Sequence, residues 1–201
     1  MTLPPAAEVE RAKILEGFIG AVAELGYQKA SLEAILDRAN LDPEEFNRYF
    51  ADKEEAFIAA WYFITERSFG RSRAAFEAES SWRDRIRAVA GAVFGYLKDH
   101  PDHARILYVE GLRAGDVGVA LLERSVDFYT ELIDGGRQEL DDPDSLTRAT
   151  AEGLAGAVYE QVSIHIARGA TEDLPELVPQ MMFMVVRPYL GYEAAMEELT
   201  R

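Results

Sequence analysis

The chain has 201 residues, a formal net charge of -15 and no cysteine, which excludes a disulfide framework and a thiolate metal site. Its 48% apolar and 28% charged residues are typical of a globular protein of one or two domains with a substantial core. No uninterrupted apolar run predicts a membrane span and the N-terminus lacks the pattern of a signal peptide, so a cytoplasmic protein without a membrane partner is expected.

The first four predicted helices occupy the chain up to about residue 70. Apolar residues recur at helical spacing before Gly26, which predicts a C-cap there. Ser31 is a typical N-cap for a second helix, and Asp42 followed by Pro43 marks the start of a third. Asp52 repeats the same signal for a fourth helix, which continues through an aromatic stretch toward residue 69.

The rest of the chain is also helical in its periodicity, and no β-alternation is present. Further helices are predicted near residues 81–99, 101–114, 117–138, 144–168 and 174–188. Glycine and proline mark the breaks between them, including a break at Pro188. The sequence therefore predicts an all-α protein. Its domain boundary is expected inside the helix 53–70, which both domains would share.

Residues 26–57 carry the most specific pattern in the chain. They predict two short helices joined by a tight turn, followed by a third helix with its own cap. This is the layout of a helix-turn-helix, whose second helix enters the major groove of DNA.

The same block resembles the tetracycline-repressor (TetR) family of bacterial regulators. The matching positions are Gly26, Tyr27, Ser31, Ile35, Ala39, Phe46, Arg48, Tyr49, Phe50, Lys53, Glu54 and Phe57. The resemblance implies a three-helix DNA-binding domain at residues 1–52 and a larger helical ligand-binding and dimerisation domain at residues 53–201. It also implies a homodimeric, ligand-responsive repressor that is not an enzyme and needs no cofactor.

Residue by residue, the resemblance assigns a DNA-contacting surface. It comprises Lys29, Ser31, Pro43, Glu44, Glu45, Asn47, Arg48, Tyr49 and Lys53. Ser31 places a hydroxyl and a helix N-terminus where a phosphate is favoured. Lys53 and Lys29 are candidates for backbone contacts, which fix register rather than sequence. Arg48 and Tyr49 are candidates for base edges or phosphates.

The chain departs from the family pattern where DNA would be contacted. The turn has Asn40 in place of the usual glycine, a mild change because asparagine tolerates the left-handed conformation. The recognition helix begins with Pro43, Glu44 and Glu45 in place of a basic run, and residues 1–52 carry a net charge of -5. A DNA-binding domain normally has the opposite sign. The alternative is a module of the same fold that binds ligands or proteins and has lost operator binding.

The C-terminal region predicts a dimer interface. Residues 173–191 resemble the closing helix of the family, and the run from Met181 to Val186 is apolar on every side. Small residues on the preceding helix permit close helix approach, and two such helices from each subunit would form a four-helix interface. The candidate interface residues are Gly153, Ala157, Met181, Met182, Met184 and Val185. The alternative is a monomer that packs them in its own core.

A ligand pocket for a small apolar effector is expected among the middle helices. The candidate lining residues are Trp61, Phe94, Tyr108, Tyr129, Tyr159 and Gln161, with Glu110 and Arg113 as polar anchors. For each of them the alternative is an ordinary core position. No metal site is predicted. A third possibility, a helical enzyme using Asp141, Asp142 and Asp144 to bind magnesium, competes with a simple helix start at Pro143.

Overall fold

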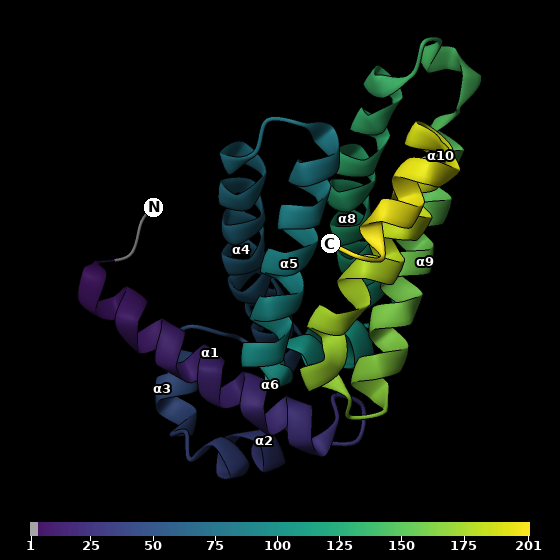
Figure 1. The fold of residues 1–201 in the computed structure, drawn as a ribbon. Helices are drawn as coiled ribbons and strands as arrows, with labels where there is room; N and C mark the ends of the chain where they lie inside the picture. The colour runs from purple at the N-terminus through teal and green to yellow at the C-terminus, as the bar shows by residue number, and fades with distance from the viewer. Residues whose placement is uncertain (1–3) are drawn as a thin grey trace. The chain divides into compact units, whose positions relative to one another are not determined.

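The structure is a computed structural model that describes residues 4–201, and every regular element in that range is a helix (Figure 1). The all-α fold predicted from the helical periodicity is therefore confirmed. Among the described residues, no helix is both long and apolar enough to cross a membrane.

The first four helices are α1 (Pro5–Leu25), α2 (Leu32–Ala39), α3 (Pro43–Asn47) and α4 (Lys53–Ala78). The predicted side-chain caps begin α2, α3 and α4, whereas Pro4 before α1 makes no side-chain cap. The Ser31 hydroxyl accepts the backbone N–H of Ala34 at 3.1 Å, and the Asp42 carboxylate accepts those of Glu44 and Glu45 at 2.7 and 3.3 Å. These bonds satisfy N–H groups that have no partner inside the helix, so each helix has a defined start.

The later elements alternate long helices with short irregular turns. They are α5 (Trp82–Asp99), α6 (Pro101–Arg105), the π-helix η1 (Ile106–Glu110), α7 (Gly111–Arg113), α8 (Asp116–Asp134), the 3-10 helices η2 (Gly135–Glu139) and η3 (Pro143–Ser145), α9 (Arg148–Ala167), the 3-10 helix η4 (Thr171–Leu177) and α10 (Val178–Glu198).

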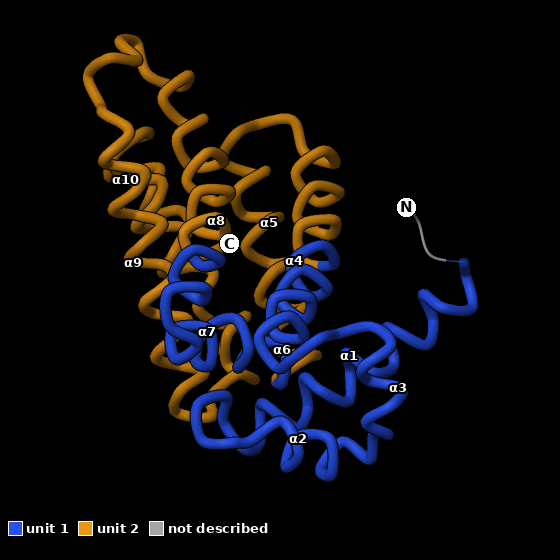
Figure 2. Tube along the Cα trace, turned by 180° about the vertical axis from the view of Figure 1, so that it is seen from behind, with its two compact units in different colours: residues 1–67, 102–122 blue, residues 68–101, 123–201 orange. Residues whose placement is uncertain are grey.

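The chain forms two compact units (Figure 2). Within the described residues, unit 1 takes the chain up to Arg67 together with Asp102–Leu122, and unit 2 takes Ser68–Pro101 and Glu123–Arg201. The first boundary between them falls inside α4, the helix that the sequence predicted two domains to share. Unit 1 also includes η1, which packs against α1. The functional boundary predicted at residue 52 remains a prediction.

The C-terminal half departs from the predicted helices at one boundary and inside one helix. Pro188 does not end its helix, because α10 continues to Glu198 and departs from helical geometry at Gly191 instead, with φ 82° and ψ 178°. Glycine adopts that conformation without a steric penalty, so the chain bends there and resumes the helix. The helix predicted at 101–114 is interrupted by the wider turns of η1.

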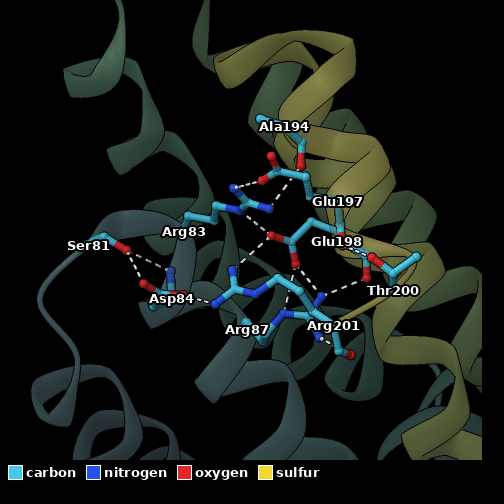
Figure 3. A network of polar contacts seen from close by, with 9 residues as sticks. All are labelled: Ser81, Arg83, Asp84, Arg87, Ala194, Glu197, Glu198, Thr200 and Arg201. Carbon is cyan, nitrogen blue, oxygen red and sulfur yellow. Dashed lines mark hydrogen bonds and ion pairs between the residues drawn. The ribbon is translucent and has the colours of Figure 1, made fainter.

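An ion-pair network in unit 2 holds the end of α10 against α5 (Figure 3). Glu198 has no exposed surface, and its carboxylate pairs with Arg83, with Arg87 and, at 3.2 Å, with Arg201. Burial alone raises the pKa of the Glu198 carboxyl, but the hydrogen bonds and charges of Arg83 and Arg87 together outweigh it and hold the pKa below its usual value. The network therefore holds the C-terminal residues of the chain against α5 within unit 2.

Candidate nucleic-acid interface

The head made by α1, α2 and α3 is built around buried aromatic rings. Phe46 of α3 has no exposed surface, and its ring centroid lies 6.3 Å from that of Phe18 on α1 and 5.3 Å from that of Phe50. Ile35 supplies the buried contact from α2. Because α3 has only five residues, packing rather than its own hydrogen bonds must hold it in place.

The turn between α2 and α3 has the geometry that the sequence predicts. Asn40 is left-handed, with φ 52° and ψ 45°, and Leu41 returns its N–H to the carbonyl of Leu36 at 2.9 Å. Beside this turn α1 and α2 approach closely, since a Cβ placed on Gly17 would lie 3.4 Å from the Cβ of Ala39. Small residues on both helices permit this approach, and the result is a compact helix-turn-helix.

The segment that leads into α2 is held by Lys53. The Lys53 ammonium donates to the backbone carbonyls of Tyr27 and Ala30 at 2.8 and 3.0 Å and lies 4.5 Å from the centre of the Tyr27 ring. It therefore fixes the stretch that carries Lys29 and Ser31, both of which are exposed. The predicted phosphate contact of Lys53 would use its remaining N–H.

A buried carboxylate also binds the segment that leads into α2. Glu110 of η1 has no exposed surface, and it accepts the backbone N–H of Tyr27 at 3.0 Å. Its other oxygen accepts from Arg105 at 3.1 Å and from Arg113 at 2.9 Å. Arg105 also donates to the carbonyl of Ala23, near the end of α1, at 2.9 Å. The pKa of the Tyr27 phenol is raised by burial and, less strongly, by the negative charges of nearby carboxylates.

The exposed face of α3 is acidic. Pro43, Glu44, Glu45 and Asn47 are all exposed, and of these only the two glutamates carry charge. A carboxylate about 4 Å from a DNA phosphate costs roughly 1 kcal/mol in water. Arg48 and Tyr49, which the sequence predicted as DNA contacts, follow α3 directly.

Arg48 and Tyr49 both bind the carboxylate of Glu10 on α1. The Arg48 guanidinium donates to one Glu10 oxygen at 2.7 Å, and the Tyr49 hydroxyl donates to the other at 2.8 Å. The hydrogen bond to Glu10 raises the pKa of the Tyr49 phenol, with smaller contributions from burial and from the Glu10 charge. The sequence did not identify Glu10, because 38 residues separate it from Arg48 and no local motif joins them.

The candidate ligand-binding residues are divided between the two units. In unit 1, Trp61 is buried and its ring packs on the backbone of Gly111, where an added Cβ would lie 2.4 Å away. Tyr108 is half-buried and Arg113 is exposed. Glu110, predicted with Arg113 as a polar anchor for a ligand, accepts three donors within the protein.

In unit 2 three of the four candidates have the burial that a pocket lining requires. Phe94 is 3% exposed, and Tyr129 and Tyr159 are half-buried. Burial raises the pKa of the Tyr129 phenol, and hydrogen bonding with the side chains of Ser68 and Ser72 opposes that rise. Gln161 is exposed on α9, so the interior position expected for it is not found.

The candidate interface residues divide by exposure. Met181, Met182 and Val185 are 6%, 1% and 3% exposed in the single chain, which places them in the core of unit 2. Gly153 is exposed, and Ala157 and Met184 are half-buried. The apolar pattern on α10 thus reflects packing within the subunit at the three buried positions. Only the other three retain surface for a second subunit.

Known proteins resemble this chain in structure but not detectably in sequence. No protein-family model matches it, and no curated protein does. The fatty acid degradation regulator FadR from Bacillus halodurans is 17% identical, covers 92% of this chain and 96% of its own, and has a TM-score of 0.78. FadR from Bacillus subtilis in complex with stearoyl-CoA is 17% identical, covers 87% and 97%, and has a TM-score of 0.74. A TetR-like transcriptional regulator from Rhodococcus sp. RHA1 is 20% identical, covers 93% and 98%, and has a TM-score of 0.66.

Proposed function

We propose that this chain, which has the fold of the TetR-family transcriptional regulators, is a homodimeric repressor that binds operator DNA and responds to a small apolar effector. The family resemblance predicted from residues 26–57 is confirmed at the level of the fold, which belongs to regulators rather than to enzymes. The DNA and effector roles are the parts that need testing.

The helix-turn-helix carries the proposal for DNA binding. A left-handed Asn40 joins α2 to α3, Phe46 anchors α3 from inside, and Arg48 remains 57% exposed on the outside. Around this helix, exposed Lys29 and the hydroxyl of Ser31 supply donors for the DNA backbone. Those groups act locally, so they can bind phosphate within a chain of negative net charge.

A fluorescence-anisotropy titration with DNA upstream of the chain's own gene tests this proposal. Binding is expected at about 50 mM salt and should weaken steeply by about 200 mM, because phosphate contacts release counterions. The control is a duplex of the same length and shuffled sequence, which should bind more weakly. Absence of binding at the lower salt concentration would contradict the proposal.

The proposed effector acts by shifting a population of two dimer states. A ligand that binds one state more tightly favours it, and the favoured state no longer fits the operator. Because the Bacillus subtilis neighbour was solved with stearoyl-CoA, a long-chain acyl-CoA is the first probe. Adding stearoyl-CoA to the protein–DNA complex should release the DNA, whereas free coenzyme A serves as the matched control without the acyl chain.

The proposed dimer uses the exposed parts of α9 and α10. Beyond the bend at Gly191, Tyr192, Met196 and Leu199 are 58%, 41% and 41% exposed and recur at helical spacing on one face. With Gly153 and Met184 they offer an apolar surface that a second subunit would cover. Sedimentation equilibrium should give twice the mass of the chain, and Met196→Glu should shift it toward the monomer.

The acidic face of α3 favours one competing function, a binding module that has lost operator binding. Glu44 and Glu45 are exposed, and nearby Arg48 is paired with Glu10 at 2.7 Å and with Glu45 at 3.7 Å. The double variant Glu44→Lys with Glu45→Lys separates the two functions. If the native protein does not bind DNA and the variant gains general DNA affinity, the module is the better description. If the native protein binds its upstream DNA, the repressor is the better description.

A further inference from the structure

The Glu10 carboxylate binds the two side chains after α3 that are best suited to a phosphate, and the Glu45 carboxylate also lies 3.7 Å from the Arg48 guanidinium. Glu10 accepts from the Arg48 guanidinium at 2.7 Å and from the Tyr49 hydroxyl at 2.8 Å, one donor on each of its oxygens. Guanidinium binds carboxylate and phosphate through the same kind of charge-assisted hydrogen bond. In the free protein, Glu10 thus stands where a DNA phosphate would bind.

We propose that Glu10 limits the DNA affinity of the head, because DNA can engage Arg48 and Tyr49 only by displacing the Glu10 carboxylate. This inference rests on the proposed DNA-binding function. Generic DNA offers only phosphate in exchange, whereas an operator adds base contacts that offset the displacement. Because the displacement costs the same on either DNA, the carboxylate lowers both affinities by the same factor.

The energies are compatible with such an exchange. Arg48 is 57% exposed and the Glu10 side chain is 39% exposed, so their ion pair is a solvent-screened surface pair that contributes little stability. DNA can break an interaction of that size. The displaced carboxylate still stays close to the phosphate, and its repulsion persists after displacement. Both effects act against every DNA sequence equally.

A second role for the same contact would have the opposite effect on DNA affinity. Glu10 also fixes the directions of Arg48 and Tyr49, and an acceptor that only positions these groups would raise DNA affinity rather than lower it. Glu10→Gln separates the roles, because the amide keeps one oxygen acceptor and the shape of the side chain but removes the negative charge.

The test measures binding of the native protein and Glu10→Gln to a generic duplex and to the upstream DNA. The matched control is Glu8→Gln, an equal charge change at an exposed position on the same helix. Glu10→Gln should bind generic DNA several-fold more tightly than Glu8→Gln at about 50 mM salt. One additional phosphate contact adds about 0.9 to the salt slope, so this advantage should fall by a factor of about three to four at about 200 mM.

A further substitution assigns the gain to the proposed contact. Adding Arg48→Met to Glu10→Gln should abolish the advantage, because no guanidinium is left to bind the phosphate. An affinity of Glu10→Gln equal to or below that of Glu8→Gln, with the native protein still binding its upstream DNA, would overturn this inference alone. Failure of both the native protein and Glu10→Gln to bind any DNA, with native circular dichroism, would overturn the proposed function as well.

Discussion

The backbone N–H of Tyr27 donates to the buried carboxylate of Glu110 at 3.0 Å, although 83 residues separate them. Tyr27 lies two residues after the end of α1, and Glu110 is the last residue of the π-helix η1. Lys53 holds the carbonyl of the same Tyr27 from α4. The stretch that presents Lys29 and Ser31 is therefore fixed by two charged groups from distant parts of unit 1.

Removing this carboxylate should destabilise unit 1. Glu110→Ala leaves the Tyr27 N–H and two guanidinium groups without their acceptor, and the expected loss in the free energy of unfolding is about 2–4 kcal/mol. Glu110→Gln keeps an acceptor and should lose less. Urea unfolding followed by circular dichroism measures both. Exposed Glu66 on α4 provides the control, since Glu66→Ala should change stability by less than about 0.5 kcal/mol.

The contrast between Asn40 and Glu110 shows how far sequence reasoning reaches. Asn40, Ser31 and Asp42 act on backbone groups within a few residues, so their types and spacing predicted the turn and the helix starts. The contacts of Glu110 with Tyr27, and of Glu10 with Arg48, join residues far apart in the sequence, and only the packed chain brings them together. The all-α fold was thus predictable, but the residues that restrain its recognition helix were not.

Position 40 should distinguish residues by their tolerance of the left-handed conformation. Asn40→Gly should be nearly neutral, because glycine adopts φ 52° without strain. Asn40→Val should cost about 1–3 kcal/mol, because a β-branched residue is strained there. Thermal unfolding of the two variants under identical conditions gives the comparison. Equal stabilities would mean that the turn between α2 and α3 does not have the geometry described above.

The Glu198 network should make part of the stability acid-sensitive. The folded-state pKa of this carboxyl lies below its ordinary value of 4.5, so its contribution is present above that pH and is lost as the pH falls through the folded pKa. Near neutral pH, Glu198→Gln should be less stable than the native protein by about 1–3 kcal/mol. The difference between the two proteins should shrink as the pH falls below about 4.5.

A second substitution isolates this effect from general acid denaturation. Glu193→Gln alters an exposed carboxyl on the same helix, and urea unfolding at several pH values should show it parallel to the native protein throughout. A gap between Glu198→Gln and the native protein that stays constant with pH would argue against the network as the source of acid sensitivity.

The buried phenol of Tyr189 should be dispensable. Its ring packs 4.9 Å from that of Trp82, and its hydroxyl has no hydrogen-bond partner among the described residues. Tyr189→Phe removes an unsatisfied polar group and keeps the ring, so stability near neutral pH should stay equal or rise by about 1 kcal/mol. A loss of more than about 1 kcal/mol would indicate that the hydroxyl has a partner, such as a bound water.

The same tyrosine should respond to alkaline pH. Burial raises the pKa of Tyr189 to about 12, with a smaller contribution from the Asp134 charge. Because the folded state favours the protonated phenol, its contribution is present below the ordinary pKa of 10 and is lost as the pH rises through about 12. Tyr189→Phe should lack this loss, whereas the control Tyr62→Phe, at an exposed position on α4, should retain it.

The apolar run of α10 does not by itself predict which of its residues form a dimer interface. Met182 and Gly153 were assigned to the same interface, yet Met182 is 1% exposed in the single chain and Gly153 is exposed. An apolar residue on a helix packs either within its subunit or against another one, and the period of the sequence is the same in both cases. The exposed fraction of each residue in the folded chain distinguishes packing within the subunit from packing against another one.

Hydroxyl-radical footprinting on the DNA upstream of the gene tests the central claim most directly, that a dimer places two copies of α3 on DNA. The account predicts two protected patches whose centres are separated by one helical turn, about 10 base pairs, or by a multiple of it. Protection should be lost in Arg48→Ala. A single patch, or uniform cleavage at about 50 mM salt with the protein in excess, would contradict it.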